Sequence, residues 1–87
     1  MAEGALNERI LTILRDVAGT AQVTRDLDVP LYTSGLLDSL ATVSLMAAFA
    51  EDLGVNVSPA EFDAAKWATP RLLIADITRR ALGGEAG

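Results

Sequence analysis

The chain has 87 residues, no cysteine, no histidine and a formal net charge of −5. A domain of this length buries only somewhat more than ~60% of its unfolded surface, so a large enclosed active site is not expected. The absence of cysteine and histidine excludes disulfides, thiolate metal sites and the commonest general base. The negative charge also argues against nucleic acid or an anionic membrane as the partner.

The negative charge is concentrated in the middle of the chain. No Lys or Arg occurs between Arg25 and Lys66, whereas that stretch holds seven carboxylates. They form either a solvated surface or a face that meets basic partners, and charge alone does not choose between the two.

The sequence contains no apolar stretch near the ~20 residues that span a bilayer, and its first residues lack the pattern of a signal peptide. We therefore expect a cytoplasmic protein that is not embedded in a membrane, and a monomer.

The first predicted helix covers residues 6–17, where apolar residues recur at helical spacing, and Gly19 is a natural stop. Over residues 20–38 the periodicity fades, and Pro30 and Gly35 interrupt the chain. A connection of this length is uncommon in a small domain unless it packs down or carries function. We expect this loop to pack across the helices.

The second predicted helix covers residues 39–53 and ends at Gly54. Leu45, Phe49 and Leu53 stack at i, i+4 and i+8, which assigns them to the core. The opposite face is small and mildly apolar, and it presents Leu40, Ser44, Ala47 and Glu51.

The last third of the chain has two helix-start signals. Residues 58–61, Ser-Pro-Ala-Glu, form a capping box that predicts a short helix, with Phe62 and Trp67 as its core anchors. Residues 69–70, Thr-Pro, start the final helix. These elements predict an all-α four-helix bundle with three longer helices, one short helix and a long loop between the first two. We expect the domain to cover residues 1–82 and residues 83–87 to form a flexible tail.

The candidate site is the junction between the long loop and the second helix, at Asp38, Ser39 and Leu40. One interpretation is structural, because Ser or Asp before an apolar helical run is an ordinary N-cap, contributing ~1 kcal/mol. The other is an exposed serine hydroxyl that a separate enzyme modifies with a phosphate group. The positive end of the helix dipole favours such a group.

Residues 36–40, Leu-Leu-Asp-Ser-Leu, resemble the phosphopantetheine attachment motif of acyl and peptidyl carrier proteins. The later elements Phe62-Asp63, Trp67 and Thr69-Pro70 resemble the D-alanyl carrier proteins of teichoic acid modification and their standalone relatives. The resemblance covers residues 26–77.

The resemblance implies a non-catalytic carrier. A phosphopantetheinyl transferase would attach 4′-phosphopantetheine from coenzyme A to Ser39. The thiol of the arm would take an acyl or aminoacyl group as a thioester. An adenylating enzyme would load this cargo, and an acyl- or aminoacyl-transferase would remove it.

Carriers of fatty acid synthesis usually bear several carboxylates on the second helix, whereas here acid appears only at Glu51 and Asp52. We therefore expect partner contacts through Leu40 and Ala47, with a carboxylate rim that steers approach. A helix-sustaining role for the small residues is equally compatible with the pattern. The full candidate partner surface comprises Asp38, Leu40, Ser44, Ala47, Glu51, Glu61 and Asp63.

Two pathway settings fit an aminoacyl carrier. The family resemblance suggests teichoic acid D-alanylation. The alanine-rich composition with six Arg to one Lys is typical of a GC-rich genome and favours polyketide or nonribosomal antibiotic assembly. An alternative function of a different class is a helical interaction module that carries no prosthetic group. An independent enzyme is the weakest hypothesis, since no paired catalytic constellation is visible.

Overall fold

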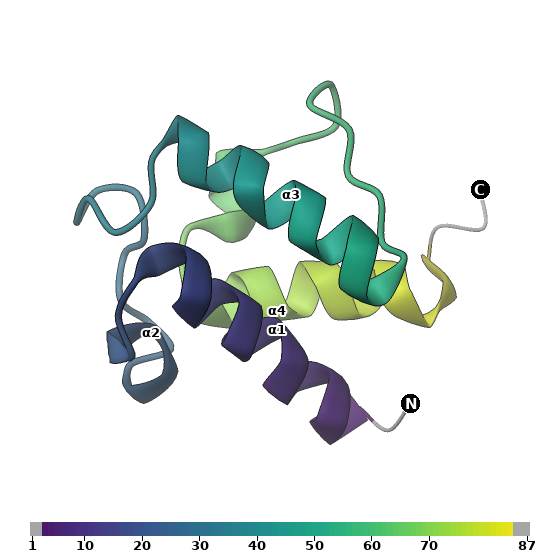
Figure 1. Ribbon diagram of the computed structural model, residues 1–87, viewed down its shortest axis with the longest axis horizontal. Helices are drawn as coiled ribbons and strands as arrows, with labels where there is room; N and C mark the ends of the chain where they lie inside the picture. Colours follow the sequence, from purple (N-terminus) through teal and green to yellow (C-terminus); the bar gives the residue numbers. More distant parts are fainter. Residues whose placement is uncertain (1–2, 85–87) are drawn as a thin grey trace.

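The computed structural model describes residues 3–84, and over that range it is an all-helical bundle without strands (Figure 1). The elements are α1 (Glu3–Ala18), α2 (Gln22–Arg25), α3 (Ser39–Leu53), the 3-10 helix η1 (Ala64–Trp67), α4 (Pro70–Arg79) and the turn η2 (Arg80–Gly84), whose backbone leaves the helical conformation at Leu82 and Gly83. The predicted small carrier-type bundle is confirmed. Residues 85–87 of the expected tail lie outside the described residues, so that boundary stays a prediction.

The ends of α1 and α3 lie where glycine predicts them. Gly19 follows α1 with φ 76°, and Gly54 follows α3 with φ 67°. Both values lie in the left-handed region, where a residue without Cβ is least strained. Each helix therefore stops where its sequence allows the chain to reverse.

A single apolar core lies between α1, α3 and α4. Leu45 and Phe49 of α3 are fully buried, as predicted, and Trp67 of η1 is only 1% exposed. The Trp67 ring meets Phe49 edge to face with centroids 5.9 Å apart, and half-buried Phe62 meets it from the other side at 5.1 Å. The predicted anchoring role of the two aromatic residues after α3 is thereby confirmed.

The long loop between α1 and α3 packs against the bundle, as expected, but it contains one element that the sequence did not predict. The single turn α2 buries Val23. Farther along, the backbone N–H of Leu31 donates to Ala68 at 2.8 Å, and that of Arg71 donates to Leu27 at 2.9 Å. These bonds fix the loop to the start of α4 and position the residues that lead into α3.

The expectation of a short helix starting at Ser58 is wrong. Residues 59–61 form a turn, and the short helix begins later, at Ala64. Asp63 is its N-cap and accepts a hydrogen bond from Ala65 N at 3.0 Å. The Glu61 carboxylate does reach back to Ser58 N, at 3.5 Å, but the chain then extends through residue 63 and carries Phe62 onto Trp67.

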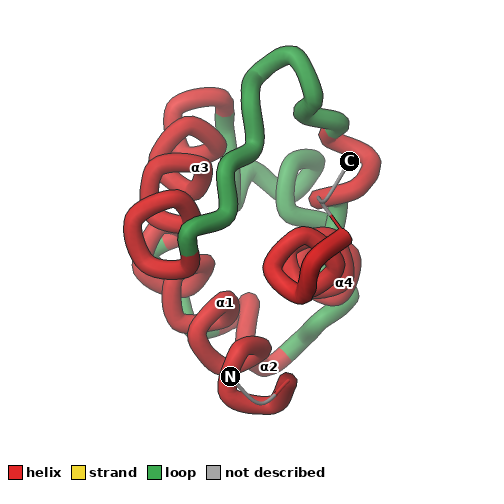
Figure 2. The backbone as a smooth tube through the Cα atoms, turned by 90° about the vertical axis from the view of Figure 1, so that its right-hand side faces the viewer, coloured by secondary structure: helices red, strands yellow, loops and turns green. Residues whose placement is uncertain are grey.

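The segment after α3 defines one side of the molecule. It leaves the C-terminal end of α3, runs back toward the N-terminal end of that helix and then enters η1 (Figure 1). Figure 1 and Figure 2 both place it on the side opposite α1. Among residues 3–84, no helix is both long enough and apolar enough to cross a membrane.

Candidate functional site

The N-terminus of α3 is capped by Asp38. Its Oδ1 accepts a hydrogen bond from Ala41 N at 2.8 Å, and its backbone is extended, with φ −130° and ψ −172°. Ser39 is the first residue of the helix, and it is exposed. Within the part of the chain that the structure describes, no hydrogen bond engages its hydroxyl. Of the two residues considered as the N-cap, Asp38 performs that role and Ser39 does not.

Two hydrogen-bonded hydroxyl groups, those of Tyr32 and Thr42, support the backbone at Asp38, next to Ser39. The hydroxyl of Thr42 donates to the carbonyl of Asp38 at 2.9 Å. Because that uses its only proton, the Tyr32 hydroxyl, 2.7 Å away, donates to Thr42 Oγ1. Burial raises the pKa of Tyr32 above its ordinary value, and its hydrogen bond to Thr42 only partly opposes the rise. Tyr32 therefore stays neutral at physiological pH and fastens the loop to α3.

The environment of Ser39 suits a phosphate ester. The residue lies at the positive end of a 15-residue helix, where backbone N–H groups and the helix dipole favour an anion. Its hydroxyl is accessible and takes no part in the packing of the bundle. A modifying enzyme can reach this oxygen, and the fold loses no internal contact when the oxygen is esterified.

A groove of about 500 Å³ begins at Ser39, between α3 and the segment of residues 59–64. A second hollow of about 600 Å³ continues it along α3, and both are lined by Val43, Met46 and Pro59. Most of the lining side chains are apolar. An extended apolar track therefore leads away from the serine.

All seven residues predicted to meet partners are exposed. Five of them lie at the start of α3 or along it, and Leu40 is 77% exposed. Glu61 and Asp63 come from the segment across the groove, and both also make intramolecular contacts: Glu61 lies 3.8 Å from Arg80, and Asp63 caps η1. A steering role for these two carboxylates must coexist with a structural one.

Sequence reasoning missed three residues beside the candidate serine. Val43 is 59% exposed and lines the groove, and Tyr32 and Thr42 form its polar floor. The i, i+4 relationship of Val43 to Ser39 was a visible signal that the two side chains lie on one face. Tyr32 gave no such signal, because its approach depends on how the long loop folds.

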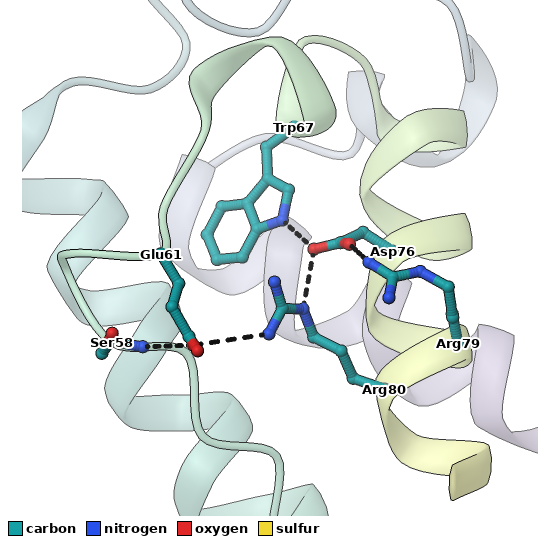
Figure 3. Close-up of polar contacts among 6 residues, drawn as sticks. All are labelled: Ser58, Glu61, Trp67, Asp76, Arg79 and Arg80. Carbon is teal, nitrogen blue, oxygen red and sulfur yellow. Dashed lines mark hydrogen bonds and ion pairs between the residues drawn. The ribbon is translucent and has the colours of Figure 1, made fainter. Parts of the chain in front are cut away.

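A buried polar network supports the far wall of the groove (Figure 3). Trp67 Nε1 donates to Asp76 Oδ2 at 2.9 Å, and Arg80 Nε donates to the same oxygen at 3.1 Å. Arg79 pairs with the other carboxylate oxygen. Burial raises the pKa of Asp76, but the hydrogen bonds from Trp67, Arg80 and Arg79 outweigh that effect and hold it below its usual value.

Arg80 connects this network to the wall segment. Its side chain is only 7% exposed, and its Nη1 lies 3.8 Å from Glu61 Oε1 (Figure 3). The turn at residues 58–61 is thereby joined to α4 through one guanidinium group. The arrangement gives the segment opposite α3 a defined position.

An exposed, unengaged serine at the start of the second long helix of a small bundle is the arrangement of a carrier protein. A family model described as the phosphopantetheine attachment site matches residues 8–77. The chain belongs to this family, whose members carry a covalently attached 4′-phosphopantetheine.

The curated relatives of the chain include D-alanyl carrier proteins. The relative from Enterococcus faecalis is 40% identical over 72 residues, which cover 83% of this chain and 92% of the relative. The relative from Bacillus cereus is 45% identical over 74 residues, covering 85% of this chain and 91% of the relative. The relative from Listeria monocytogenes strain EGD-e is 38% identical over 73 residues, with 84% and 94% covered. The resemblance inferred from the motifs is confirmed.

Proposed function

We propose that Ser39 is the attachment residue and that the chain holds an amino acid for delivery to partner enzymes. The observation that carries this proposal is the exposed Ser39 hydroxyl, left without an internal partner beside the Asp38 cap. The family to which the chain belongs identifies the attached group as 4′-phosphopantetheine. The N-terminus of α3 is a favourable position for the phosphate of that group.

The composition of the chain indicates which steps a partner enzyme performs and which role is left to the chain itself. Attachment joins the Ser39 oxygen to the phosphorus of the phosphopantetheine unit, releases the nucleotide half of coenzyme A, and passes the serine proton to a base of the transferase. The chain has no histidine or cysteine of its own. Once attached, the arm supplies the thiol that carries the cargo as a thioester. The chain presents that cargo and catalyses no reaction itself.

D-Alanine is the first cargo to test. The relatives at 38–45% identity are D-alanyl carrier proteins, and they span the same domain as this chain. The antibiotic-assembly setting is supported by composition alone and stays a prediction. We therefore place D-alanylation ahead of it.

The proposed partners are a phosphopantetheinyl transferase, an adenylating enzyme and an aminoacyl- or acyltransferase. The exposed Leu40 and Ala47 supply a small apolar contact, and the carboxylates around them supply electrostatic steering. The chain acts from the cytoplasm in this proposal.

Attachment is tested by intact-mass measurement after incubation with coenzyme A and a broad-specificity phosphopantetheinyl transferase. The wild type and Ser58→Ala, which removes another exposed hydroxyl outside the candidate partner surface, should gain the mass of one phosphopantetheine unit. Ser39→Ala should gain none. An unmodified wild type would favour the helical interaction module, and a modified Ser39→Ala would assign the arm elsewhere.

Cargo is tested on the loaded protein with ATP and a D-alanine-activating adenylating enzyme. D-Alanine should add its mass to the arm in preference to L-alanine and larger amino acids. If D-alanine is refused and another amino acid is accepted from its own adenylating enzyme, the antibiotic-assembly setting takes precedence. Turnover of any substrate by the purified chain alone would contradict the non-catalytic role.

A further inference from the structure

The outer surface of α4 exposes apolar side chains on a different side of the molecule from Ser39. Leu72 is 45% exposed, and Leu82, in η2 just after α4, is 57% exposed. Among the described residues, the other large apolar side chains left in solvent are Leu40 and Val43, both at the start of α3. Figure 2 shows α4 across the molecule from α3. The chain therefore has a second exposed apolar surface, which the proposed contacts around Ser39 do not use.

The exposed side chains of this surface have the spacing of a helix-packing stripe. Leu72, Ala75, Arg79 and Leu82 are separated by three, four and three residues, and all four are exposed. Leu73, on the inner side of the same helix, is fully buried in the core. A repeat of three and four residues is that of the a and d positions at which one helix packs against another. We refer to these four exposed residues as the α4 face.

Two hollows flank the α4 face, and both are lined by Ala75 and Arg79. The larger, of about 400 Å³, lies toward α1, where Asn7 lines it. The smaller, of about 270 Å³, lies toward η1, where Lys66 lines it. A ridge with a hollow on either side is a surface that the side-chain ridges of a second helix can fill.

The charges around the α4 face are positive, in contrast to the middle of the chain. Residues 66–84 contain four cations and one carboxylate, which is buried, whereas residues 26–65 contain seven carboxylates and no cation. Lys66 is exposed, and the side chains of Arg71 and Arg79 are 61% and 51% exposed. An apolar stripe with cations at its edges is complementary to an acidic amphipathic helix.

An anionic bilayer fits this surface less well than such a helix does. Anionic lipid headgroups attract clusters of several Lys and Arg residues. Two of the three cations at the α4 face are already shared with a carboxylate of the chain, Arg71 with Asp28 and Arg79 with Asp76. The chain as a whole is also negative. The positive charge is therefore enough to orient the carboxylates of a partner helix but low for a membrane.

We propose that the α4 face binds an acidic amphipathic helix of a partner protein. The apolar side chains of that helix lie against Leu72 and Leu82, and its carboxylates lie beside Lys66 and Arg79. Because α4 is across the molecule from α3, this partner stays bound while another enzyme acts at Ser39. The α4 face thereby keeps the carrier attached to one protein and leaves α3 free for the exchange of others. The inference does not depend on attachment at Ser39.

The first test titrates the ¹⁵N-labelled full chain with a three-heptad peptide that has Leu at a and d and Glu at e and g. Its like charges discourage the peptide from pairing with itself. The amide resonances of the α4 face should shift, whereas those of residues 38–43 should not. A matched peptide with Lys at e and g should leave the α4 face unshifted. Failure of the Glu peptide to shift the α4 face, or equal shifts with both peptides, would overturn the proposal.

The second test changes the middle of the α4 face. Ala75→Glu places a carboxylate there and should raise the dissociation constant of the Glu peptide about tenfold, because like charges then meet. Ala75→Gln, of the same size but uncharged, should have a smaller effect. Ala5→Glu makes the acidic change at an exposed alanine of α1 outside both α4 hollows, and should leave the dissociation constant within about twofold.

Urea unfolding followed by far-UV circular dichroism verifies that the three variants are folded before their dissociation constants are compared. Equal weakening by Ala75→Glu and Ala5→Glu would reduce the effect to net charge and remove the assignment of the α4 face. Equal weakening by Ala75→Glu and Ala75→Gln would contradict the requirement for an acidic partner.

The third test asks whether the α4 face and Ser39 are used at the same time. Attachment of phosphopantetheine to the wild type, followed by intact mass, should proceed at the same rate with and without saturating Glu peptide. Ala75→Glu, which binds the peptide weakly, reports any effect of the peptide on the transferase itself. A slower rate confined to the wild type would show that the two surfaces overlap and would refute simultaneous binding. The peptide titration needs no attachment, so a failure of the α4 face and a failure at Ser39 are distinguishable.

Two other occupants of the α4 face would give different results. Vesicles of phosphatidylglycerol should not co-sediment with the chain, and co-sedimentation that Ala75→Glu abolishes would assign the face to a membrane. Sedimentation velocity should show a monomer, and self-association that Ala75→Glu abolishes would assign the face to a second copy of the chain. Either result would replace the acidic helix as the partner.

Discussion

The Oδ1 atom of Asp38 lies 2.8 Å from the backbone nitrogen of Ala41 and closes the first turn of α3. Asp38→Ala should therefore lower the free energy of unfolding by about 1 kcal/mol, the typical value of an N-cap. Asp38→Asn, which keeps the accepting oxygen, should retain most of the free energy of unfolding that Asp38→Ala loses. Ser39→Ala should stay within about 0.5 kcal/mol of the wild type, as for surface changes elsewhere.

Urea unfolding of the three apo variants, followed by far-UV circular dichroism, measures these differences. The comparison separates capping from attachment at adjacent residues. A loss at Ser39→Ala as large as that at Asp38→Ala would mean that the serine hydroxyl supports the helix after all.

The left-handed backbone at Gly54 gives a second prediction. Gly54→Ala should destabilise the chain by about 1 kcal/mol, because φ is 67° there although no atom would obstruct the new Cβ. Gly4→Ala is the matched control, since it lies within α1 and also meets no neighbouring atom. It should be neutral or stabilising by up to about 1 kcal/mol.

Thermal and urea unfolding of the two glycine variants provide the measurement. Opposite signs are expected for the same chemical change. Equal losses at both positions would show that backbone conformation does not determine the cost.

The helices that sequence predicts well are those with local signals. Gly19 and Gly54 mark the ends of α1 and α3, and Thr69 caps α4 through a 3.2 Å bond from Leu72 N. Each of these signals acts within a few residues, so it can be recognised from a short segment of the sequence. The single turn α2 has no such signal and exists because Val23 reaches the core.

The capping box at residues 58–61 shows that a local helix-start signal can be present without a helix. Its Glu61 contact with Ser58 is present, but no helix follows, because Phe62 packs against Trp67 and Glu61 approaches Arg80. Those partners lie farther along the chain. The same reason explains why Ser39 could be found from its motif, whereas the groove beside it required the folded structure.

The exposed apolar surface of α3 gives a third prediction. Leu40→Ser should weaken binding to the adenylating enzyme about tenfold, since the Leu40 side chain is 77% exposed and would be buried in the proposed contact. Leu72→Ser, on α4, changes the same side chain at 45% exposure and should leave the dissociation constant unchanged. Isothermal titration calorimetry on the loaded carriers measures both, and equal weakening by the two changes would remove the assignment of this face.

Ionic strength tests the carboxylate rim of the same surface. Raising salt from 50 to 500 mM should slow association several-fold and leave dissociation nearly unchanged, because exposed charges act mainly on encounter. Stopped-flow measurement gives both rates. An association rate that does not respond to salt would exclude a steering role for Asp38, Glu51, Glu61 and Asp63.

Asp76 gives the pH dependence of folding. Its carboxylate receives hydrogen bonds from Trp67, Arg79 and Arg80, which hold its pKa below the usual value despite burial. A depressed folded-state pKa contributes stability that is present above the unfolded pKa of about 3.9 and is lost as pH falls through the folded value. The chain should therefore keep this contribution at neutral pH and lose it below about pH 4.

Asp76→Asn tests this contribution, because the amide can still accept from Trp67 but leaves the arginines without their buried charge. It should cost about 3 kcal/mol at pH 7, and its difference from the wild type should shrink as pH falls below about 4. Asp28→Asn is the control: Asp28 pairs with Arg71 at 2.9 Å on the exposed surface, so its loss should change stability little. Urea unfolding at pH 3 to 7 measures both variants. A difference for Asp76→Asn that does not vary with pH would show that the lost stability comes from packing and not from the carboxylate charge.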